Sequence, residues 1–345
     1  MITEKSGNLL LDDADALVNT VNTVGVMGKG LALQFKRAYP DNFEAYRAAC
    51  ARGSVVPGKI FSTRLVDGRW ILNFPTKRHW RERSRLADIE SGLVALAKVI
   101  DELGLRSVAI PPLGCGNGGL EWSVVRALIM DRLGGTDCEI RLYGLGTPDP
   151  RDMPVDPRPP RMNLRRSRLL HAVRAYATAS LFAGVAIDTA TSLVEVHKTV
   201  YLLQAAGLDL GYRFERGKYG PVSFDLNREL AGLEGHYLVG YGDGTGGARA
   251  DLELLPAGLE ACASGDPEFD RAWGAVAEAI SGYEYPDGME LLGTVHFVAA
   301  EAATFDVDEV ARLVASWNQR KRALFSRADI GQALAHLRTT AVLTG

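Results

Sequence analysis

Cysteine is scarce in this sequence, and long apolar runs are missing from it. The four cysteines, at positions 50, 115, 138 and 262, form no CxxC pair and have no histidine cluster beside them, so we expect neither a zinc site nor a disulfide framework. No run reaches the roughly 18 apolar residues that a membrane-spanning helix needs. The N-terminus also lacks the basic segment and apolar core of a secretory signal. These absences predict a cytoplasmic protein with reduced thiols, no membrane partner, and no bound metal or cofactor.

Charge is distributed unevenly along the 345 residues. The net charge is −3 overall, but it is +2 for residues 1–155, +5 for residues 156–174 and −10 for residues 175–345. A chain of this length is expected to form two domains at roughly 100–200 residues each. The acidity of the C-terminal part has two interpretations, because it can attract a basic partner or simply keep a domain in solution.

The first part of the chain, residues 1–152, alternates short β-branched runs with helical patterns. Such alternation predicts an α/β domain with its functional loops at the carboxyl ends of the strands. The expected strands are Ile2–Thr3, Ala16–Val18, Arg69–Phe74, Ser107–Pro111 and Glu139–Gly144. The expected helices are Gly30–Phe35, Pro40–Arg52, Leu86–Leu103 and Trp122–Leu133.

Residues 153–168 hold four prolines and five arginines, which indicates a stiff, exposed linker. Its arginines could touch a phosphate backbone or simply be solvated. Residues 169–345 then predict a mainly helical second domain with a small β hairpin in His236–Leu255. The expected helices are Leu169–Gly184, Thr191–Ala206, Asp270–Ile280, Val307–Trp317 and Ile330–Arg338.

Two glycine loops stand out in the first domain. Val18–Lys36 runs from a strand end through two asparagines and a glycine loop into a helix, and residues 108–122 repeat the order of strand, glycine loop and helix. This arrangement presents backbone N–H groups and a helix N-terminus to a phosphate. Neither loop has GxGxxG or P-loop spacing, and each alone could be a tight βα connection. Together they predict two arms that can grip a diphosphate.

The segments VNTVN, GVMGKG and PPLGCGNGGLEW together resemble a macrodomain, the α/β module that binds ADP-ribose. The resemblance covers about residues 1–150 and is strongest to the DarG antitoxin family, whose macrodomain removes ADP-ribose from thymidine in single-stranded DNA. The human terminal ADP-ribose protein glycohydrolase has a similar layout. The resemblance implies a three-layer α/β fold with a mixed sheet and a DNA ADP-ribosyl glycohydrolase activity.

The resemblance also implies roles for individual residues. Asn22 would lie beside the distal ribose, Asn19 would brace the loop, and Asn8 stands where many macrodomains carry an adenine-binding aspartate. Gly118 stands where the protein-directed hydrolase has an aspartate, so a second acid/base group is not evident. The substrate-binding residues implied are Asn8, Asn19, Asn22, Gly25, Met27, Gly28, Gly30, Leu113, Gly114, Cys115, Gly116, Asn117, Gly118 and Gly119.

Lys77 matches the catalytic lysine of this branch of the macrodomains. It could attack C1″ of the ribose through a Schiff base, or stabilise developing charge as a cation. A neutral amine needs a lowered pKa, which the neighbouring arginines would favour. The cluster after Lys77 interleaves cations with an aromatic ring and suits single-stranded DNA, the alternative being a solvated loop. The DNA-contact candidates are Arg78, Trp80 and Arg81.

Residues 196–222 of the second domain are similar to the SocA/Panacea-like antitoxin domain, with Tyr219-Gly220-Pro221 as the recognisable core. The DarG resemblance implies that residues 169–345 hold a toxin of the DarT type, a DNA ADP-ribosyltransferase. The acidity of this part suggests mimicry of DNA, and the alternative is a helical domain in which Tyr-Gly-Pro is only a turn.

Three functions fit these patterns. The leading hypothesis is an antitoxin that removes ADP-ribose from thymidine in single-stranded DNA. The alternatives are a non-catalytic ADP-ribose reader, and a hydrolase of ADP-ribosylated protein or of ADP-ribose 1″-phosphate.

Overall fold

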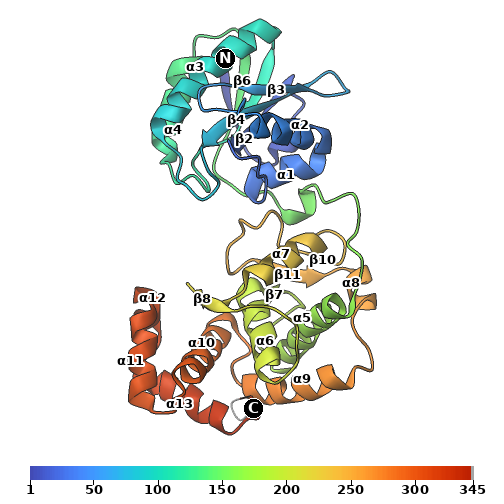
Figure 1. Ribbon diagram of the computed structural model, residues 1–345, viewed down its shortest axis with the longest axis vertical. Coiled ribbons are helices and arrows are strands. Elements are labelled where there is room, and N and C mark those ends of the chain that lie inside the picture. The colour runs from blue at the N-terminus through green and yellow to red at the C-terminus, as the bar shows by residue number, and fades with distance from the viewer. Residues whose placement is uncertain (343–345) are drawn as a thin grey trace. The chain divides into compact units, whose positions relative to one another are not determined.

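The computed structural model describes residues 1–342 and divides the chain into two compact units, residues 1–157 and residues 158 onward (Figure 1). The division falls inside the Pro/Arg-rich segment 153–168. Each unit has its own hydrophobic core, so each is described by itself.

Unit 1 is built on a six-stranded sheet with the strand order β1-β6-β5-β2-β4-β3. Every neighbouring pair is parallel except β3 and β4, which form an antiparallel hairpin. The sheet is therefore mixed, as predicted. Its strands are β1 Ile2–Lys5, β2 Ala16–Asn22, β3 Phe61–Arg64, β4 Trp70–Lys77, β5 Ser107–Ile110 and β6 Glu139–Tyr143.

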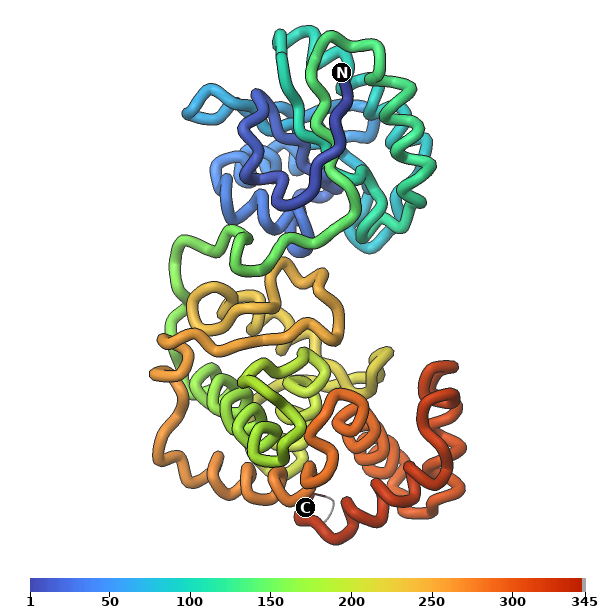
Figure 2. The backbone as a smooth tube through the Cα atoms, turned by 180° about the vertical axis from the view of Figure 1, so that it is seen from behind, coloured from blue at the N-terminus to red at the C-terminus, as the bar shows by residue number. Residues whose placement is uncertain are grey.

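Helices cover both faces of this sheet, as Figures 1 and 2 show. Successive residues of β2 point to opposite faces. Leu17 packs in a cluster with Phe35, whereas Val18 packs in a cluster with Ile89. The predicted three-layer fold is thus confirmed. One layer contains α1 Gly30–Ala38 and α2 Pro40–Ala51, and the other contains α3 Leu86–Leu103 and α4 Trp122–Leu133.

The two central strands run further than the sequence pattern predicted, to Asn22 in β2 and Lys77 in β4. The expected strands ended at Val18, which Asn19 follows, and at Phe74, which Pro75 follows. In the structure Asn19 lies opposite Asn73, and the Asn19 Nδ2 donates to the Asn73 Oδ1 at 2.9 Å. This hydrogen bond between the two buried amides allows polar residues inside the sheet. The sequence analysis also missed β3, a short and half-exposed edge strand.

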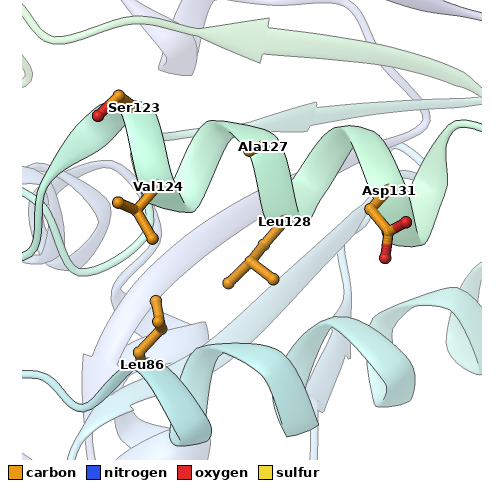
Figure 3. Close-up of a pocket in the computed structure, with 6 residues that line it drawn as sticks. All are labelled: Leu86, Ser123, Val124, Ala127, Leu128 and Asp131. Carbon is orange, nitrogen blue, oxygen red and sulfur yellow. The ribbon is translucent and has the colours of Figure 1, made fainter.

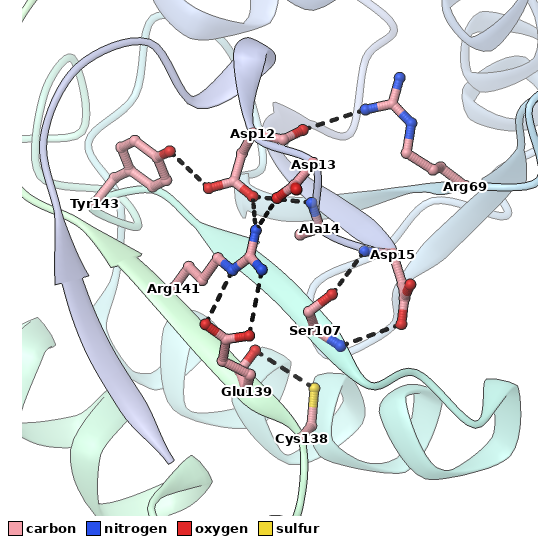
Figure 4. Close-up of polar contacts among 10 residues, drawn as sticks. All are labelled: Asp12, Asp13, Ala14, Asp15, Arg69, Ser107, Cys138, Glu139, Arg141 and Tyr143. Carbon is pink, nitrogen blue, oxygen red and sulfur yellow. Dashed lines mark hydrogen bonds and ion pairs between the residues drawn. The ribbon is translucent and has the colours of Figure 1, made fainter.

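A polar cluster ties β6 to the segment before β2 (Figure 4). The Asp12 carboxylate accepts hydrogen bonds from Arg141 at 2.6 Å and from the Tyr143 hydroxyl at 2.7 Å. Burial alone would raise the pKa of Asp12, but these donors lower it below its ordinary value. Arg141 also pairs with Asp13 and Glu139, so one guanidinium holds three carboxylates.

Unit 2 is mainly helical, as predicted. The helices are α5 Leu164–Phe182, α6 Leu193–Ala205, α7 Phe224–Leu233, α8 Pro256–Glu260, α9 Pro267–Ile280, α10 Pro286–Ala302, α11 Val307–Trp317, α12 Gln319–Leu324 and α13 Arg327–Arg338. The hairpin expected in His236–Leu255 is present as β10 Leu238–Val239 and β11 Asp251–Leu254, and β7 Thr191–Ser192 joins it. A second small hairpin pairs β8 Glu215–Gly217 with β9 Gly220–Val222.

The predicted linker is too long at its C-terminal end. Residues 164–168 form the first turn of α5, because the Asn163 side chain accepts a hydrogen bond from the Arg166 N–H and caps the helix. The arginines of this turn form ion pairs within unit 2. Arg166 pairs with Glu229, and Arg168 pairs with Asp266 at 2.6 Å. Unit 2 as a whole therefore carries 19 lysines and arginines against 23 aspartates and glutamates, a net charge of −4.

The sequence analysis missed α10, the central helix of unit 2. Residues 288–296 of this helix are all buried, so it shows no apolar stripe on one side and a polar face on the other. A helix that is buried on every side lacks the 3.6-residue hydrophobic period by which an amphipathic helix is recognised. The expected start of α6 at Thr191 was also wrong, since Thr191 and Ser192 pair with β11 before Ser192 caps the helix.

Candidate active site

The sheet register brings together two candidate residues that lie far apart in the sequence. Asn22 at the end of β2 lies opposite Lys77 at the end of β4. A register shift between Val21 and Asn22 places them together, since Val21 pairs with Pro75. Both strands end at the same edge of the parallel part of the sheet, so the two residues lie side by side there.

Asn22 organises the first glycine loop. Its Oδ1 accepts hydrogen bonds from the N–H groups of Val24 at 3.0 Å and Val26 at 3.3 Å, and its Nδ2 donates to the Val26 carbonyl at 2.5 Å. The hydroxyl of the fully buried Tyr46 donates to the Asn22 carbonyl at 2.6 Å. The contact with the distal ribose stays a prediction, whereas the shaping of this loop by Asn22 is part of the structure.

Asn19 lies deeper, below the same loop. Its Nδ2 contacts the Met27 sulfur at 3.9 Å besides bonding Asn73, and Met27 is itself buried. The Asn73 Nδ2 in turn donates to the Asn42 Oδ1 at 2.8 Å. A chain of buried amides from β2, β4 and α2 therefore lies below the loop, and the bracing role of Asn19 stays a prediction.

The first loop leads directly into α1. Gly25 has a φ of 81° and Gly30 a φ of 64°, conformations that glycine adopts without strain. The N-cap residue of α1, Lys29, makes no side-chain capping hydrogen bond, and neither does Glu121, the N-cap residue of α4. The first N–H groups of both helices are thus not used by their caps, which suits them to bind an anion. Gly28 lies between these positions in the same loop.

The second loop, residues 113–119, folds tightly on itself. The Leu120 N–H donates to the Gly114 carbonyl and the Gly119 N–H to the Gly116 carbonyl, both at 3.1 Å. A Cβ at Gly118 would lie 2.1 Å from the Gly114 oxygen and 2.3 Å from the Ser84 Oγ. No side chain fits at Gly118 in this conformation, so the aspartate of the protein-directed hydrolase has no room here. Leu113 and Cys115 are buried and anchor the loop in the core.

Lys77 connects the strand edge to the second loop, because its ammonium or amine Nζ donates to the Asn117 carbonyl. Burial lowers the pKa of Lys77 below its ordinary value. The sequence analysis attributed such a lowering to the neighbouring arginines, and this was wrong. The nearest of them, Arg78, turns away to pair with the buried carboxylate of Asp88 at 3.0 Å.

The basic segment after Lys77 is fastened to both glycine loops. The Thr23 hydroxyl donates to the Arg78 carbonyl at 2.6 Å, and the Ser84 N–H donates to the Gly118 carbonyl at 3.0 Å. Trp80 and Arg81 are exposed, whereas the guanidinium of Arg78 is held by Asp88. Of the three DNA-contact candidates, Trp80 and Arg81 are therefore better placed than Arg78 to meet a ligand.

Asn8 has partners of its own. Its Oδ1 accepts a hydrogen bond from the Leu10 N–H at 2.9 Å, and its Nδ2 donates to the Asp152 carbonyl at 2.8 Å. The amide caps the short helix Leu9–Leu11 and fastens the end of unit 1. Its contact with adenine stays a prediction.

A separate pocket of about 560 Å³ lies between the start of α3 and the outer side of α4 (Figure 3). It is lined by Leu86, Ser123, Val124, Ala127, Leu128 and Asp131. None of the predicted site residues lines it, so it is distinct from the two-loop site. Among residues 1–342, no group of three or more His, Cys, Asp or Glu side chains is placed to hold a metal ion.

In unit 2 the Tyr219-Gly220-Pro221 core forms the turn and start of the β8–β9 hairpin. Gly220 has a φ of 93°, and a Cβ there would lie 2.7 Å from the Thr294 Oγ1. The Tyr219 ring lies 5.1 Å from the guanidinium carbon of Arg320 on α12. The buried Lys198 donates to the Pro221 carbonyl at 3.0 Å. No helix within the described part of the chain has the length and apolar character to cross a membrane.

Comparison with known proteins decides the family. The Macro domain family model matches residues 18–129. A DNA ADP-ribosyl glycohydrolase of Thermus aquaticus is 41% identical over 337 residues, which cover 95% of this chain and 90% of that protein. The chain belongs to the DNA ADP-ribosyl glycohydrolase family. The resemblance to the DarG antitoxins and the expectation of a hydrolase are thereby confirmed.

Two further relatives of this glycohydrolase are similar to unit 1. A DNA ADP-ribosyl transferase–DNA ADP-ribosyl glycohydrolase fusion protein of Thermosipho africanus is 36% identical over 155 residues, 40% of each chain. The macrodomain of Mycobacterium tuberculosis DarG is 53% identical and covers 42% of this chain and 99% of that one, with a TM-score of 0.42.

Three residues beside the candidate site were not expected from the sequence. Tyr46, Ser84 and Asp88 bond to a loop or to a residue beside Lys77, yet none belongs to a motif. Asp88 lies in the first turn of α3, where an acid is ordinary. Only the sheet register and the packing of α2 and α3 bring these side chains to the site.

Proposed function

We propose that this protein hydrolyses the N-glycosidic bond between ADP-ribose and thymidine in single-stranded DNA, with Lys77 as its catalytic residue. The observation that carries the proposal is the position of Lys77. It ends β4 opposite Asn22, and its Nζ reaches the Asn117 carbonyl in the second loop. A partly buried amine therefore lies where both glycine loops meet.

The two loops and their helices account for binding of the ADP-ribose. The uncapped N-termini of α1 and α4 offer N–H groups to the diphosphate. Asn22 holds the first loop over the distal ribose, and Gly114 to Gly119 enclose it from the other side. The C1″ atom is thereby presented to Lys77.

Two routes are open to Lys77. As a nucleophile, the neutral amine forms a bond to C1″ while the bond from C1″ to the thymine nitrogen breaks, and the proton that the amine loses passes to that nitrogen. The ribose ring then opens at its C1″–O4″ bond to give a Schiff base, with a proton taken up by the ring oxygen, and water hydrolyses the Schiff base to free ADP-ribose and the lysine amine. As a cation, it stabilises the charge that develops as the glycosidic bond breaks. The lowered pKa of Lys77 increases the neutral fraction and supports the first route.

A second acid or base is not supplied by the second loop, because Gly118 admits no side chain. The next carboxylate along the chain is Glu121, three residues after Gly118, at the N-cap of α4. We propose that oxygens of the substrate itself activate the water, since ribose hydroxyls and phosphates lie at the reacting carbon once the ligand is bound.

We further propose that residues 169–345 hold a DarT-type toxin and that the two activities together make an antitoxin. The Thermosipho relative, whose name joins a transferase to a glycohydrolase, supports such a partnership. Mimicry of DNA by acidity alone has weaker support, because six arginines between residues 158 and 174, four of them in α5, bring the net charge of unit 2 to −4. Retention of the toxin by residues 1–157 as well as by the full chain would contradict the assignment of toxin binding to unit 2.

A substrate panel tests the activity. We expect release of ADP-ribose from ADP-ribosylated single-stranded DNA, and little release from ADP-ribosylated protein or from ADP-ribose 1″-phosphate. Tight binding of the modified DNA without turnover would indicate a reader, and preferred turnover of another member of the panel would replace the proposed substrate.

A further inference from the structure

We propose that His79, Trp80 and Arg81 form a stacking platform for a nucleobase that flanks the modified thymidine, so that the enzyme recognises a strand and not a single nucleotide. This inference rests on the proposed function and names a second subsite for the same substrate. It begins from an unusual exposure, because 46% of the Trp80 surface is accessible to solvent.

The three side chains are already arranged in a stack. The rings of His79 and Trp80 lie with centroids 5.4 Å apart and planes inclined by 29°. The Arg81 guanidinium carbon lies 4.5 Å from the centre of the Trp80 ring. A guanidinium and a nucleobase are both flat groups that stack on aromatic rings, so a base can extend this stack or replace Arg81 on it.

The backbone below the stack is fixed before any ligand arrives. The Glu82 N–H donates to the His79 carbonyl at 3.0 Å, which closes a turn around Trp80. On one side of this turn Thr23 holds the Arg78 carbonyl, and on the other Ser84 holds the Gly118 carbonyl. The platform is therefore anchored to both loops of the active site, and little ordering is needed for binding.

The charges around the stack favour a nucleic acid. Arg81, Arg83 and Arg85 are exposed, and within residues 1–342 none of them forms an ion pair with a carboxylate. Glu82 is the single acid between Arg78 and Arg85. Unpaired arginines beside exposed rings suit the phosphates and bases of one strand.

The position of the platform fixes which part of the substrate it meets. His79 lies two residues beyond Lys77, on the segment that links the two loops. With C1″ of the ADP-ribose at Lys77, the thymidine lies at the mouth of the site, and the adjoining nucleotide passes the stack.

The test compares the same bond in two substrates, ADP-ribosylated thymidine as a nucleoside and as the central residue of a single-stranded oligonucleotide. Wild type is expected to have a kcat/KM higher by about tenfold on the oligonucleotide, the effect of one stacked base. Trp80→Ala is expected to lose this gain and to keep the nucleoside rate. Trp80→Phe, which keeps a flat ring, is expected to retain most of the gain. Phe182→Ala removes another exposed aromatic side chain, from unit 2, and serves as the control.

Each other outcome has a definite meaning. Equal wild-type rates on the two substrates would overturn the platform and leave the hydrolase in place, whereas no release from either would overturn the proposed function. Binding of free ADP-ribose, measured by calorimetry, must be unchanged in Trp80→Ala. A loss there equal to the loss on the oligonucleotide would assign Trp80 to the adenine of ADP-ribose and would also overturn the inference.

Discussion

Asn22 and Lys77 lie opposite each other at the ends of two neighbouring parallel strands, and a register shift of one residue places them there. Without that shift Asn22 would lie beside Thr76, whose hydroxyl bonds the Val21 carbonyl at 3.4 Å. The amide that orders the first loop and the amine that reaches the second are thus held by one backbone feature. The predictions that follow concern this pair and the residues that support it.

The pH dependence of turnover distinguishes the two routes for Lys77. Burial lowers its pKa, so its neutral form becomes abundant at a lower pH than the ordinary lysine value of about 10.4. If the neutral amine attacks C1″, the rate rises with pH and levels off at this lowered pKa. We expect this profile, and we expect Lys77→Arg to be inactive because a guanidinium forms no Schiff base. A rate that falls above the pKa, with activity retained in Lys77→Arg, would show that the lysine acts as a cation.

Gly118→Ala is expected to disrupt the second loop. A Cβ there would lie 2.1 Å from the Gly114 oxygen, so the loop has to open, at a cost of about 1–3 kcal/mol for overpacking. We expect ADP-ribose affinity to fall about tenfold in a calorimetric titration, in line with that cost. Gly135→Ala is the control, because a Cβ at Gly135 meets nothing within 4 Å and Gly135 lies outside both loops. Equal affinities in the two variants would contradict the tight loop described for Gly118.

Tyr46→Phe is expected to loosen the first loop through Asn22. The variant leaves the buried Asn22 carbonyl without its 2.6 Å donor, which costs about 1–3 kcal/mol of stability. Tyr143→Phe removes a comparable buried bond to Asp12, at 2.7 Å. Both variants should lower the melting temperature, but only Tyr46→Phe should also weaken ADP-ribose binding. Unchanged binding in Tyr46→Phe would show that Asn22 keeps its place without the tyrosine.

Lys198 makes the stability of unit 2 depend on pH. Burial, and then the nearby positive charge of Lys321, lower the pKa of Lys198 to about 7. In the unfolded chain its pKa is about 10.4, so between pH 7 and 10 the unfolded state binds more protons and the free energy of unfolding rises with pH. Below pH 7 the folded state carries the whole cost of the buried charge.

Lys198→Met is expected to flatten this rise in the free energy of unfolding, because the methionine side chain can pack against Gly293 as the lysine stem does but carries no charge. Chemical denaturation at several pH values measures the effect. The wild type should gain roughly 1.4 kcal/mol per pH unit from this group across the window. An identical slope in Lys198→Met would contradict a lowered pKa at this position.

The parts of the fold that the sequence predicted are those with a one-sided pattern. Helix α3 was expected with the bounds it has, because its apolar residues recur on one side. Helix α10 was missed, since it is buried on every side and shows no period. The end of β2 was missed because Asn19 looks like a loop residue, and only its pairing with Asn73 across the strands makes it acceptable in a sheet. The end of β4 was missed because Pro75 ordinarily interrupts a strand.

Candidate site residues could be named from the sequence where they belong to a motif. Residues that reach the site only through packing could not. The two glycine loops and Lys77 came from local sequence and from the macrodomain resemblance. Tyr46 and Asp88 act through hydrogen bonds from helices distant in the chain, and no spacing rule connects them to the loops. Arg78 shows the same limit from the other side, since a basic cluster does not reveal which of its arginines pairs with a buried carboxylate.

The most direct test of the central claim is single-turnover release of ADP-ribose from ADP-ribosylated single-stranded DNA by wild type and by Lys77→Ala. Wild type should release the ADP-ribose, and the variant should lose at least a hundredfold in rate, the lower end expected for loss of a catalytic group, while still binding free ADP-ribose. Release by Lys77→Ala at the wild-type rate would contradict the account, because the pairing of Lys77 with Asn22 would then have no part in the chemistry.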